Sequence, residues 1–260
     1  MAETHHKAVL ITGAGKRIGR ALSEALAADG WAIAAHYAGS KNEAEALVAD
    51  ISDKGGNAIA LQADLRDAAA VETLIAKAAD ALGPLTALIN NASVFERDTA
   101  HTLTPESWDT HLNANLRGPA LLMRDFANQP QLNDGSTDDA CIINITDQRV
   151  DRLTPDFISY TVSKTGLATL TQTFAQALAP QHIRVNAIGP GPTLPNPRQQ
   201  QSEFDKQARL VPLGHGATPD DIVAAARYIL SARAMTGQTI MQDGGQHLAW
   251  QTPDVTQVKE

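Results

Sequence analysis

Seven short apolar segments recur along the chain, and amphipathic stretches separate them. The apolar segments span residues 7–12, 31–37, 57–62, 85–90, 141–146, 182–188 and 239–242. Their length and nearly continuous apolar character are typical of strands that a parallel sheet buries on both faces. Because parallel strands need long crossover connections, the alternation predicts an α/β fold, with a single doubly wound parallel sheet and helices on both faces.

Helix signals fill the connections between these segments. Helices are expected over residues 16–29, 41–54 and 67–82, each followed by a glycine, and over residues 156–179. Thr104-Pro105 and Thr218-Pro219 each begin a further helix with a capping threonine and a first-turn proline. Residues 189–217 are rich in Pro and Gly, with a short helix expected near 200–207. A segment of this kind is either a functional lid or disordered, and we expect a substrate lid.

Composition narrows the class of partner. The chain has 260 residues and a formal net charge of −8, and no linker interrupts it, so we expect one domain over residues 1–260. The acidic balance disfavours a nucleic-acid partner. No apolar run approaches the roughly 20 residues that cross a bilayer, so no membrane partner is expected. The first apolar run is also too short for a signal peptide, which favours a cytoplasmic location.

Cysteine and histidine usage excludes two further kinds of site. Cys141 is the single cysteine, so the chain forms no intrachain disulfide, and its place in an apolar segment indicates a buried residue. The eight histidines show no ligand spacing, so we expect no metal site. His101 and His111 are expected at the surface.

A glycine-rich turn follows the first apolar segment. It reads Thr12-Gly13-Ala14-Gly15-Lys16-Arg17-Ile18-Gly19. Glycines allow a sharp turn and a close approach of the backbone to a pyrophosphate at the following helix N-terminus. The spacing differs from the common Gly-x-Gly-x-x-Gly pattern, and a purely structural turn is the alternative. The position between first strand and first helix favours a dinucleotide site with contributions from Gly13, Gly15, Lys16, Arg17, Ile18 and Gly19.

The end of the second apolar segment indicates which dinucleotide. NAD sites place an acidic residue about 20 residues beyond the glycine turn to bind the ribose hydroxyls. Residues 31–42 contain no acid and include His36, Tyr37, Ser40 and Lys41. Ser40, Lys41 and Arg17 suit a 2′-phosphate instead, which predicts NADP(H). The alternative for Lys41 is a solvated charge at the start of a helix.

Tyr160 and Lys164 share one face of the expected long helix, because they are four residues apart. A phenol has an ordinary pKa near 10, and a nearby ammonium lowers it. Such a pair can exchange a proton with a substrate while a nicotinamide exchanges hydride.

These motifs together resemble the short-chain dehydrogenase/reductase family over nearly the whole chain. The matches are the turn from Thr12 to Gly19, Asp64-Leu65, Asn90-Asn91-Ala92, Asn115, Tyr160 with Lys164, Pro190-Gly191 and Asp243-Gly244-Gly245. The resemblance implies a Rossmann-like domain, a small-molecule substrate and a homotetramer or homodimer. It implies that Asp64 and Leu65 flank the adenine, that Asn90, Asn91, Ala92 and Ser93 line the cofactor cleft, and that Pro190, Gly191 and Thr193 contact the nicotinamide end. It also implies a proton path from Asn115 to Lys164.

Two departures from the family pattern point to one branch. Arg17 stands where the family usually has its middle glycine, and Asp147 stands where it usually has a catalytic serine, thirteen residues before Tyr160. Both departures, with Ser93, Phe95 and His36-Tyr37, look like the pteridine reductase branch, which includes dihydromonapterin and dihydrofolate reductases. That branch's His-Arg step before Ser40 is replaced here by Ala38-Gly39.

A pterin suits these substitutions. It is flat and can stack on Phe95, and its carbonyl and ring nitrogen lie within reach of Arg17. Reduction of its C=N bond needs a proton at nitrogen, and an ionised Asp147 raises the pKa of Tyr160 and keeps it a proton donor. The expected substrate residues are Arg17, Ser93, Phe95, Asp147 and Tyr160. The expected catalytic residues are Asp147, Tyr160, Lys164 and Asn115.

Three functions stay open at this point. The first is NADPH-dependent reduction of a pterin or dihydrofolate C=N bond. The second is reduction of a 3-oxoacyl or sugar carbonyl, which the missing serine disfavours. The third is a non-catalytic NADP(H) sensor, which Asn115, Tyr160 and Lys164 disfavour. Phe95 has packing under the lid as its alternative role, and Arg17 has phosphate binding alone.

Overall fold

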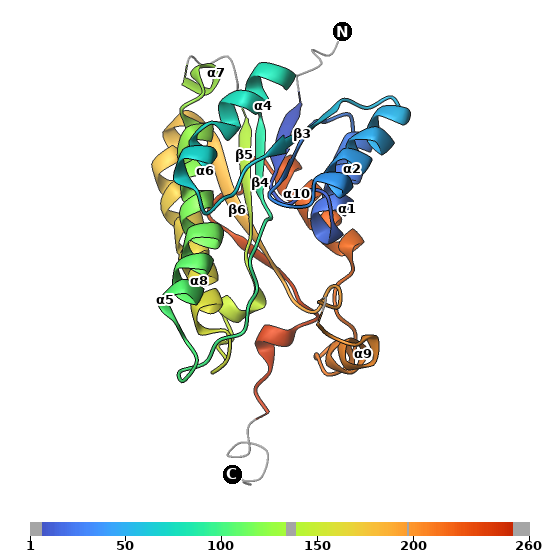
Figure 1. Ribbon diagram of the computed structural model, residues 1–260, viewed down its shortest axis with the longest axis vertical. Coiled ribbons are helices and arrows are strands. Elements are labelled where there is room, and N and C mark those ends of the chain that lie inside the picture. The colour runs from blue at the N-terminus through green and yellow to red at the C-terminus, as the bar shows by residue number, and fades with distance from the viewer. Residues whose placement is uncertain (1–6, 134–138, 197, 252–260) are drawn as a thin grey trace.

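A central sheet of seven parallel strands organises the computed structural model, which describes residues 7–133, 139–196 and 198–251 (Figure 1). The strands are β1 (Ala8–Ile11), β2 (Ala32–Tyr37), β3 (Ala58–Gln62), β4 (Ala87–Asn90), β5 (Ala140–Ile145), β6 (Ile183–Pro190) and β7 (Thr239–Gln242). Their spatial order is β3-β2-β1-β4-β5-β6-β7, and every pairing is parallel. The order reverses between β1 and β4, which is the signature of a doubly wound fold. The predicted fold class is confirmed.

Helices cover both faces of the sheet (Figure 1). One face packs against α1 (Arg17–Ala28), α2 (Lys41–Asp53) and α10 (Pro219–Ser231). The other packs against α3 (Ala68–Glu72), α4 (Leu74–Leu82), α6 (Gly118–Ala127) and α8 (Ile158–Leu178), with α5 (Pro105–Leu112) packed beside α8. The short helix α7 (Pro130–Asn133) precedes β5. Helix α9 (Gln201–Arg209) lies beyond the carboxyl ends of the strands (Figure 1).

Helix boundaries differ from the sequence prediction in three places. The helix expected over 67–82 divides at Thr73, whose hydroxyl donates to the Ala70 carbonyl at 3.0 Å and competes with the backbone bond. Helix α5 passes through a π-helical turn, η1 (Asn113–Arg117), into α6, where Pro119 lacks the amide hydrogen that an α-helix needs. Helix α8 begins at Ile158, because Phe157 has a left-handed backbone (φ 60°). The short helix expected near 200–207 is confirmed as α9.

Three 3₁₀ turns complete the chain's helical elements within the described residues. They are η2 (Gln148–Val150), η3 (Ala179–Gln181) and η4 (Gln246–Leu248). Turn η2 directly follows β5 and brings Arg149 to the carboxyl edge of the sheet, and η4 follows β7 at the same edge.

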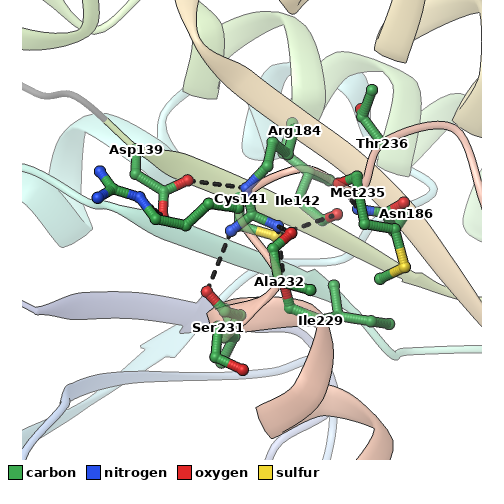
Figure 2. Close-up of polar contacts among 12 residues, drawn as sticks. Asp139, Cys141, Ile142, Arg184, Asn186, Ile229, Ser231, Ala232, Met235 and Thr236 are labelled. Carbon is green, nitrogen blue, oxygen red and sulfur yellow. Dashed lines mark hydrogen bonds and ion pairs between the residues drawn. The ribbon is translucent and has the colours of Figure 1, made fainter.

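A buried arginine joins the sheet to α10 at the opposite, amino edge. Arg184 of β6 has 7% of its surface exposed, and its Nε donates to Asp139 at 2.8 Å. Its guanidinium also donates to the carbonyls of Ile229, Leu230 and Ala232 at the C-terminus of α10 (Figure 2). These carbonyls have no partner within the helix, so Arg184 supplies the donors that close this helix end.

Candidate active site

Two adjoining cavities lie along the carboxyl ends of the strands. The glycine-turn cleft, of about 540 Å³, lies between the β1–α1 turn and the segments after β2, β3 and β4. The Tyr160 cavity, of about 840 Å³, lies between the segment after β5, helix α8 and residues 190–207. Arg17, Ile18, Asn91 and Ser93 belong to the walls of both. The two cavities are therefore continuous, at the edge where open α/β sheets bind ligands.

The glycine turn is packed too tightly for side chains. Gly13 has a φ of +64°, and Asn91 Nδ2 donates to the carbonyls of Thr12 and Gly13 at 2.8 and 3.2 Å. A Cβ on Gly19 would lie 2.1 Å from the Gly13 oxygen, which no backbone tolerates without moving. Arg17 adopts φ 54°, a left-handed conformation that suits the glycine usual at this place in the family. The glycines thus bring the start of α1 against the turn.

Most of the predicted cofactor residues line these two cavities. The glycine-turn cleft contains Gly13, Lys16, Arg17, Ile18, Gly19, His36, Ser40, Asp64, Leu65, Asn91, Ala92 and Ser93. The Tyr160 cavity contains Tyr160, Lys164, Pro190, Gly191 and Thr193. The structure does not bring Gly15, Tyr37, Lys41 or Asn90 into either lining, and Asn90 is buried with a bond to Asn144 at 2.8 Å. Gly15 packs against α2, and the Lys41 side chain is 65% exposed and pairs with Glu45 at 3.6 Å.

The His36 side chain forms a hydrogen bond with the backbone of the glycine turn. Its Nδ1 accepts from the Gly13 amide at 3.2 Å, and its Nε2 lies 3.0 Å from the Ala63 carbonyl, so Nε2 carries the hydrogen. Burial lowers the pKa of His36 to about 4. The ring is therefore neutral at pH 7, and its contribution to the cleft is the geometry of the glycine turn.

Sequence reasoning missed a cation in the glycine-turn cleft. Arg66 lines it, and its guanidinium pairs with Asp64 at 2.6 Å, with a further bond from its own amide at 2.9 Å. This pair holds the pKa of Asp64 below its ordinary value. The one acid in the lining is thus paired to a cation, and Ser40 lies in the same lining with no acid at the end of β2. The donors, cations and glycine backbone of this cleft fit a dinucleotide with an added phosphate. In the sequence, Arg66 directly follows Asp64-Leu65, and this position was the signal from which the cation could have been predicted.

Tyr160 and Asp147 form the central hydrogen bond of the second cavity. The phenol donates to Asp147 Oδ2 at 2.7 Å. Burial, and then the Asp147 carboxylate, raise the pKa of Tyr160 well above its ordinary value, while Arg149 and Ser93 act weakly in the opposite direction. Tyr160 is therefore a protonated phenol at neutral pH, as the sequence suggested for Asp147 in place of serine.

Lys164 lies beneath Tyr160 in the protein interior. Its Nζ donates to the Ile145 carbonyl at 2.8 Å and lies 5.9 Å from the centre of the Tyr160 ring. Burial lowers the pKa of Lys164 to about 8, and the Asp147 carboxylate opposes this shift. Lys164 and Asp147 were expected to act on the phenol in opposite directions, and burial together with Asp147 sets the direction, since the pKa of Tyr160 is raised.

Asn115 ties the segment after β4 to helix α8. Its side-chain Oδ1 accepts from the Val94 N–H at 2.8 Å. Its Nδ2 donates to the Val94 carbonyl at 2.9 Å and to Ser163 Oγ at 3.1 Å. Ser163 in turn donates to the Tyr160 carbonyl at 2.6 Å. Asn115 thereby fixes the loop that carries Ser93 and Phe95 relative to the catalytic helix. The proton path through Asn115 stays a prediction.

Two stacked phenylalanines form one wall of the Tyr160 cavity. The rings of Phe95 and Phe157 are parallel within 4°, with centroids 4.4 Å apart, and Tyr160 meets Phe95 edge-on at 4.7 Å. The Arg149 guanidinium lies 5.5 and 5.1 Å from the two phenylalanine rings and 3.4 Å from Asp147. Phe157 thus covers one face of Phe95, which limits where a flat substrate can stack. The spacing of motifs gave no sign of Phe157 or Arg149.

The segment after β6 crosses the mouth of this cavity. Arg17 donates to the carbonyls of Leu194 and Pro195 at 3.1 and 2.5 Å, and burial lowers its pKa. Arg198, in the same segment after β6, donates to the Phe95 carbonyl at 2.8 Å and pairs with Glu96, both in the segment after β4. Arg17 therefore contacts the segment expected to form the lid. Pro197, also in that segment, lies outside the described residues.

A buried polar network lies behind the phenylalanine wall. Asp98 accepts hydrogen bonds from Ser159 and Ser107, and its carbonyl accepts from the Phe157 amide at 2.8 Å. His111 accepts from the Glu96 amide at 3.0 Å and lies 2.8 Å from Ser159 Oγ. His111 is fully buried, so its expected surface position was wrong. His111 lies on α5, which packs on α8, and there it contacts the buried Ser159 hydroxyl. The spacing of motifs in the sequence does not reveal this contact.

His101 and Cys141 agree with expectation. His101 is exposed, and Cys141 is buried in β5, where burial raises the pKa of its thiol to about 12. Within residues 7–133, 139–196 and 198–251, no group of three or more His, Cys, Asp or Glu side chains is arranged to hold a metal ion. None of the helices in the described part of the chain combines the length and apolar character needed to cross a membrane.

Comparison with known proteins identifies the family. A family model described as enoyl-(acyl carrier protein) reductase matches residues 13–247. The chain belongs to the short-chain dehydrogenase/reductase family, as its motifs predicted. A crystal structure of FolM alternative dihydrofolate reductase 1 from Brucella canis complexed with NADP is 45% identical, with a TM-score of 0.90, and the match covers 96% of this chain and 97% of that one.

Two curated relatives extend this comparison. An uncharacterized oxidoreductase of Methylorubrum extorquens is 34% identical over 252 residues, covering 94% of this chain and 99% of the relative. The 3-oxoacyl-[acyl-carrier-protein] reductase FabG of Staphylococcus aureus is 32% identical over 246 residues, covering 93% and 98%. With the NADP-bound structures, these matches confirm the prediction of an NADP-dependent short-chain reductase.

Proposed function

We propose that this protein is an NADPH-dependent reductase of a dihydrofolate or related pterin C=N bond. The observation that carries the proposal is the 2.7 Å hydrogen bond from the buried Tyr160 phenol to Asp147, inside a cavity continuous with the glycine-turn cleft. The similarity to the Brucella canis dihydrofolate reductase supports it. A phenol that stays protonated at neutral pH suits a reaction that must protonate nitrogen as hydride reaches carbon.

NADPH would be held by the residues of the glycine-turn cleft. The turn from Gly13 to Gly19 and the start of α1 would bind the pyrophosphate, and Ser40 and Arg66 would meet the 2′-phosphate. Asp64 and Leu65 would flank the adenine, and Thr193 would contact the nicotinamide amide. NADPH supplies the hydride when it is bound.

The chain's own residues handle the proton. Tyr160 Oη gives its proton to the substrate nitrogen, so the reduced product carries a new C–H and a new N–H bond. Asp147 holds the phenol in position before the transfer, and the charge of Lys164 stabilises the phenolate that remains. Asn115 keeps the loop of Ser93 and Phe95 against the reacting region. Arg17, Ser93 and Phe95 orient the substrate, with residues 189–217 as its lid.

Carbonyl reduction is the second candidate because of the similarity to FabG. The serine expected in such enzymes is replaced by Asp147, whose carboxylate faces Tyr160 and would repel a developing oxyanion. A non-catalytic NADP(H) sensor is the third candidate. Its weakness is that Tyr160, Lys164 and Asp147 keep an arrangement suited to proton transfer, which cofactor binding alone does not need.

Steady-state NADPH oxidation tests the proposal. The substrates are dihydrofolate, dihydrobiopterin, dihydromonapterin and an acetoacetyl thioester, each repeated with NADH. Turnover of a dihydropterin or dihydrofolate with NADPH preferred is the expected result. Turnover of the thioester alone would replace the proposal by the carbonyl reductase, and NADPH binding without any turnover would favour the sensor. The homo-oligomeric state and cytoplasmic location stay predictions, which light scattering and cell fractionation test.

A further inference from the structure

The charged side chains around the Tyr160 cavity are not equally available to a ligand. Among the described residues that line it, Arg17 is assigned to the substrate ring and donates to the carbonyls of residues 194 and 195, and Lys164 is buried against Ile145. Arg149 is held between Asp147 and the phenylalanine wall. Arg198 differs, because its side chain is 60% exposed and its acid partner Glu96 is 57% exposed.

The Arg198 guanidinium is nevertheless held in a defined place. Its Nη2 donates to the Phe95 carbonyl at 2.8 Å, and its backbone amide donates to Asn196 Oδ1 at 2.8 Å. The backbone of Glu96 is also held in place, because its N–H donates to the ring of the buried His111 at 3.0 Å. A cation with a set position, at the mouth of the cavity and next to the Phe95 backbone, is arranged to meet the extension of a ring that lies inside.

The Arg198–Glu96 pair costs little to exchange. Ion pairs between exposed side chains contribute little to stability, because water solvates both partners well when they separate. A carboxylate on a ligand offers Arg198 the same hydrogen bonds that Glu96 provides, and a released Glu96 returns to water. A neutral ligand offers no such replacement and leaves the pair in place.

We propose that Arg198 is a specificity residue that binds a carboxylate on the substrate's side chain, and that Glu96 occupies this position until the substrate arrives. The inference rests on the proposed function and adds a substrate class to it: a flat reducible ring with an acidic tail, as in dihydrofolate, in preference to a neutral dihydropterin. Glu96 acts as a competing internal ligand, and Arg198 is the group for which the substrate competes.

The test compares kcat/KM for dihydrofolate with kcat/KM for dihydrobiopterin, whose side chain is uncharged. Arg198→Met lowers the ratio of the two values about tenfold, which is the loss of one charge-assisted hydrogen bond. Glu96→Gln raises the ratio about threefold, because it removes the internal competitor for Arg198. A threefold change corresponds to about half the free energy of a tenfold change, as expected for an exposed ion pair. Opposite effects of the two variants exclude a general loss of folding as the explanation.

Arg97→Met is the matched control. Arg97 lies on the same segment and pairs with Asp156 at 2.9 Å, but it lies outside the cavity lining. We expect Arg97→Met to leave the ratio of kcat/KM for dihydrofolate to kcat/KM for dihydrobiopterin unchanged. A second readout is ionic strength: added salt raises KM for dihydrofolate in the wild-type protein and has less effect in Arg198→Met. A ratio within twofold of wild type in Arg198→Met, with both substrates reduced, would overturn the inference and leave the proposed function standing. Wild-type protein that reduces neither substrate would overturn the proposed function itself.

Discussion

Replacement of Asp147 tests whether Tyr160 is the proton donor. Asp147→Asn keeps an acceptor for the phenol but removes the charge, and Asp147→Ser introduces the side chain usual in the family. The 2.7 Å bond from Tyr160 to the carboxylate has the geometry of a charge-assisted hydrogen bond. Such bonds contribute about 1.5–3 kcal/mol and neutral ones about 0.5–1.5 kcal/mol, so the loss is about 1–1.5 kcal/mol. We expect kcat/KM for the dihydrofolate-type substrate to fall about five- to tenfold.

The pH profile gives the more specific readout. A phenol donates its proton only below its pKa, so activity is lost as pH rises through that value. Burial and Asp147 raise the pKa of Tyr160, so removing the carboxylate moves the alkaline loss of activity to lower pH. Asp147 also opposes the downward shift of the Lys164 pKa, which is about 8, so the change in Lys164 acts in the same direction.

The assay follows kcat/KM for NADPH oxidation from neutral to alkaline pH in the wild type and both variants. Asp151→Asn serves as the control, because it removes an equal charge from an exposed position four residues away. Equal or higher activity in Asp147→Ser, with the alkaline limb unmoved, would show that the carboxylate does not govern Tyr160. The proton-donor role of Tyr160 would then need another support.

Three further outcomes follow from the geometry. Gly19→Ala places a Cβ 2.1 Å from the Gly13 oxygen and must displace the turn, so the Kd for NADPH in a fluorescence titration rises at least about tenfold; an unchanged Kd would contradict it. Arg184→Met removes the donors to the last carbonyls of α10 and leaves Asp139 with Arg233 alone, at 3.6 Å, so it lowers the free energy of unfolding in urea by about 3 kcal/mol, whereas a loss below about 1 kcal/mol would show that the network is weak. The pKa of His36 drops from 6.5 to about 4 on folding, so the unfolded chain binds the extra proton and stability falls as pH is lowered between those values. The loss reaches about 3 kcal/mol in urea titrations and is absent in His36→Gln, and equal pH dependence in both proteins would refute it.

The sequence predicted the sheet because its strands carry the signal locally. Apolar runs such as residues 141–146 need both faces covered, and that requirement alone indicates parallel strands between helices. Helix ends were less accessible. The break at Thr73 depends on one hydroxyl competing for one carbonyl, and the late start of α8 depends on the backbone of Phe157. Neither event changes the hydrophobic period from which a helix is read.

In the candidate site too, some residues could be placed from the sequence and others depend on tertiary packing. Tyr160, Lys164 and Asp147 meet because the first two share a helix face and the third lies two residues after the end of β5, so motif spacing was sufficient to place them. Arg66 and His111 could not be placed so, because Arg66 lies in the loop after β3 and the place of His111 depends on how α5 packs on α8. Motif spacing locates groups within one helix or at the end of a strand, whereas tertiary packing decides the place of groups on loops and on helices that pack beside the site.

Two residues that line the Tyr160 cavity have a backbone conformation that is rare for residues with side chains. Arg17 and Phe157 both line it and both have left-handed backbones, with φ of 54° and 60°. For residues with side chains this conformation costs about 1–2 kcal/mol each. Among the described residues, His182 is the other non-glycine with positive φ, and it lies at the amino end of β6.

Each of the two cavity residues has bonds that maintain its conformation. The Phe157 amide donates to the Asp98 carbonyl at 2.8 Å, and the Arg17 guanidinium donates to the carbonyls of residues 194 and 195. Glycine at either position would remove the backbone cost and, with it, the ring or guanidinium that forms the wall. Strain that a glycine would relieve, at two positions on opposite sides of one cavity, is expected where side-chain chemistry outweighs stability. The same cavity holds the Tyr160–Asp147 bond and the Arg198–Glu96 pair, so substrate recognition and proton transfer both depend on walls whose shape local propensity does not favour.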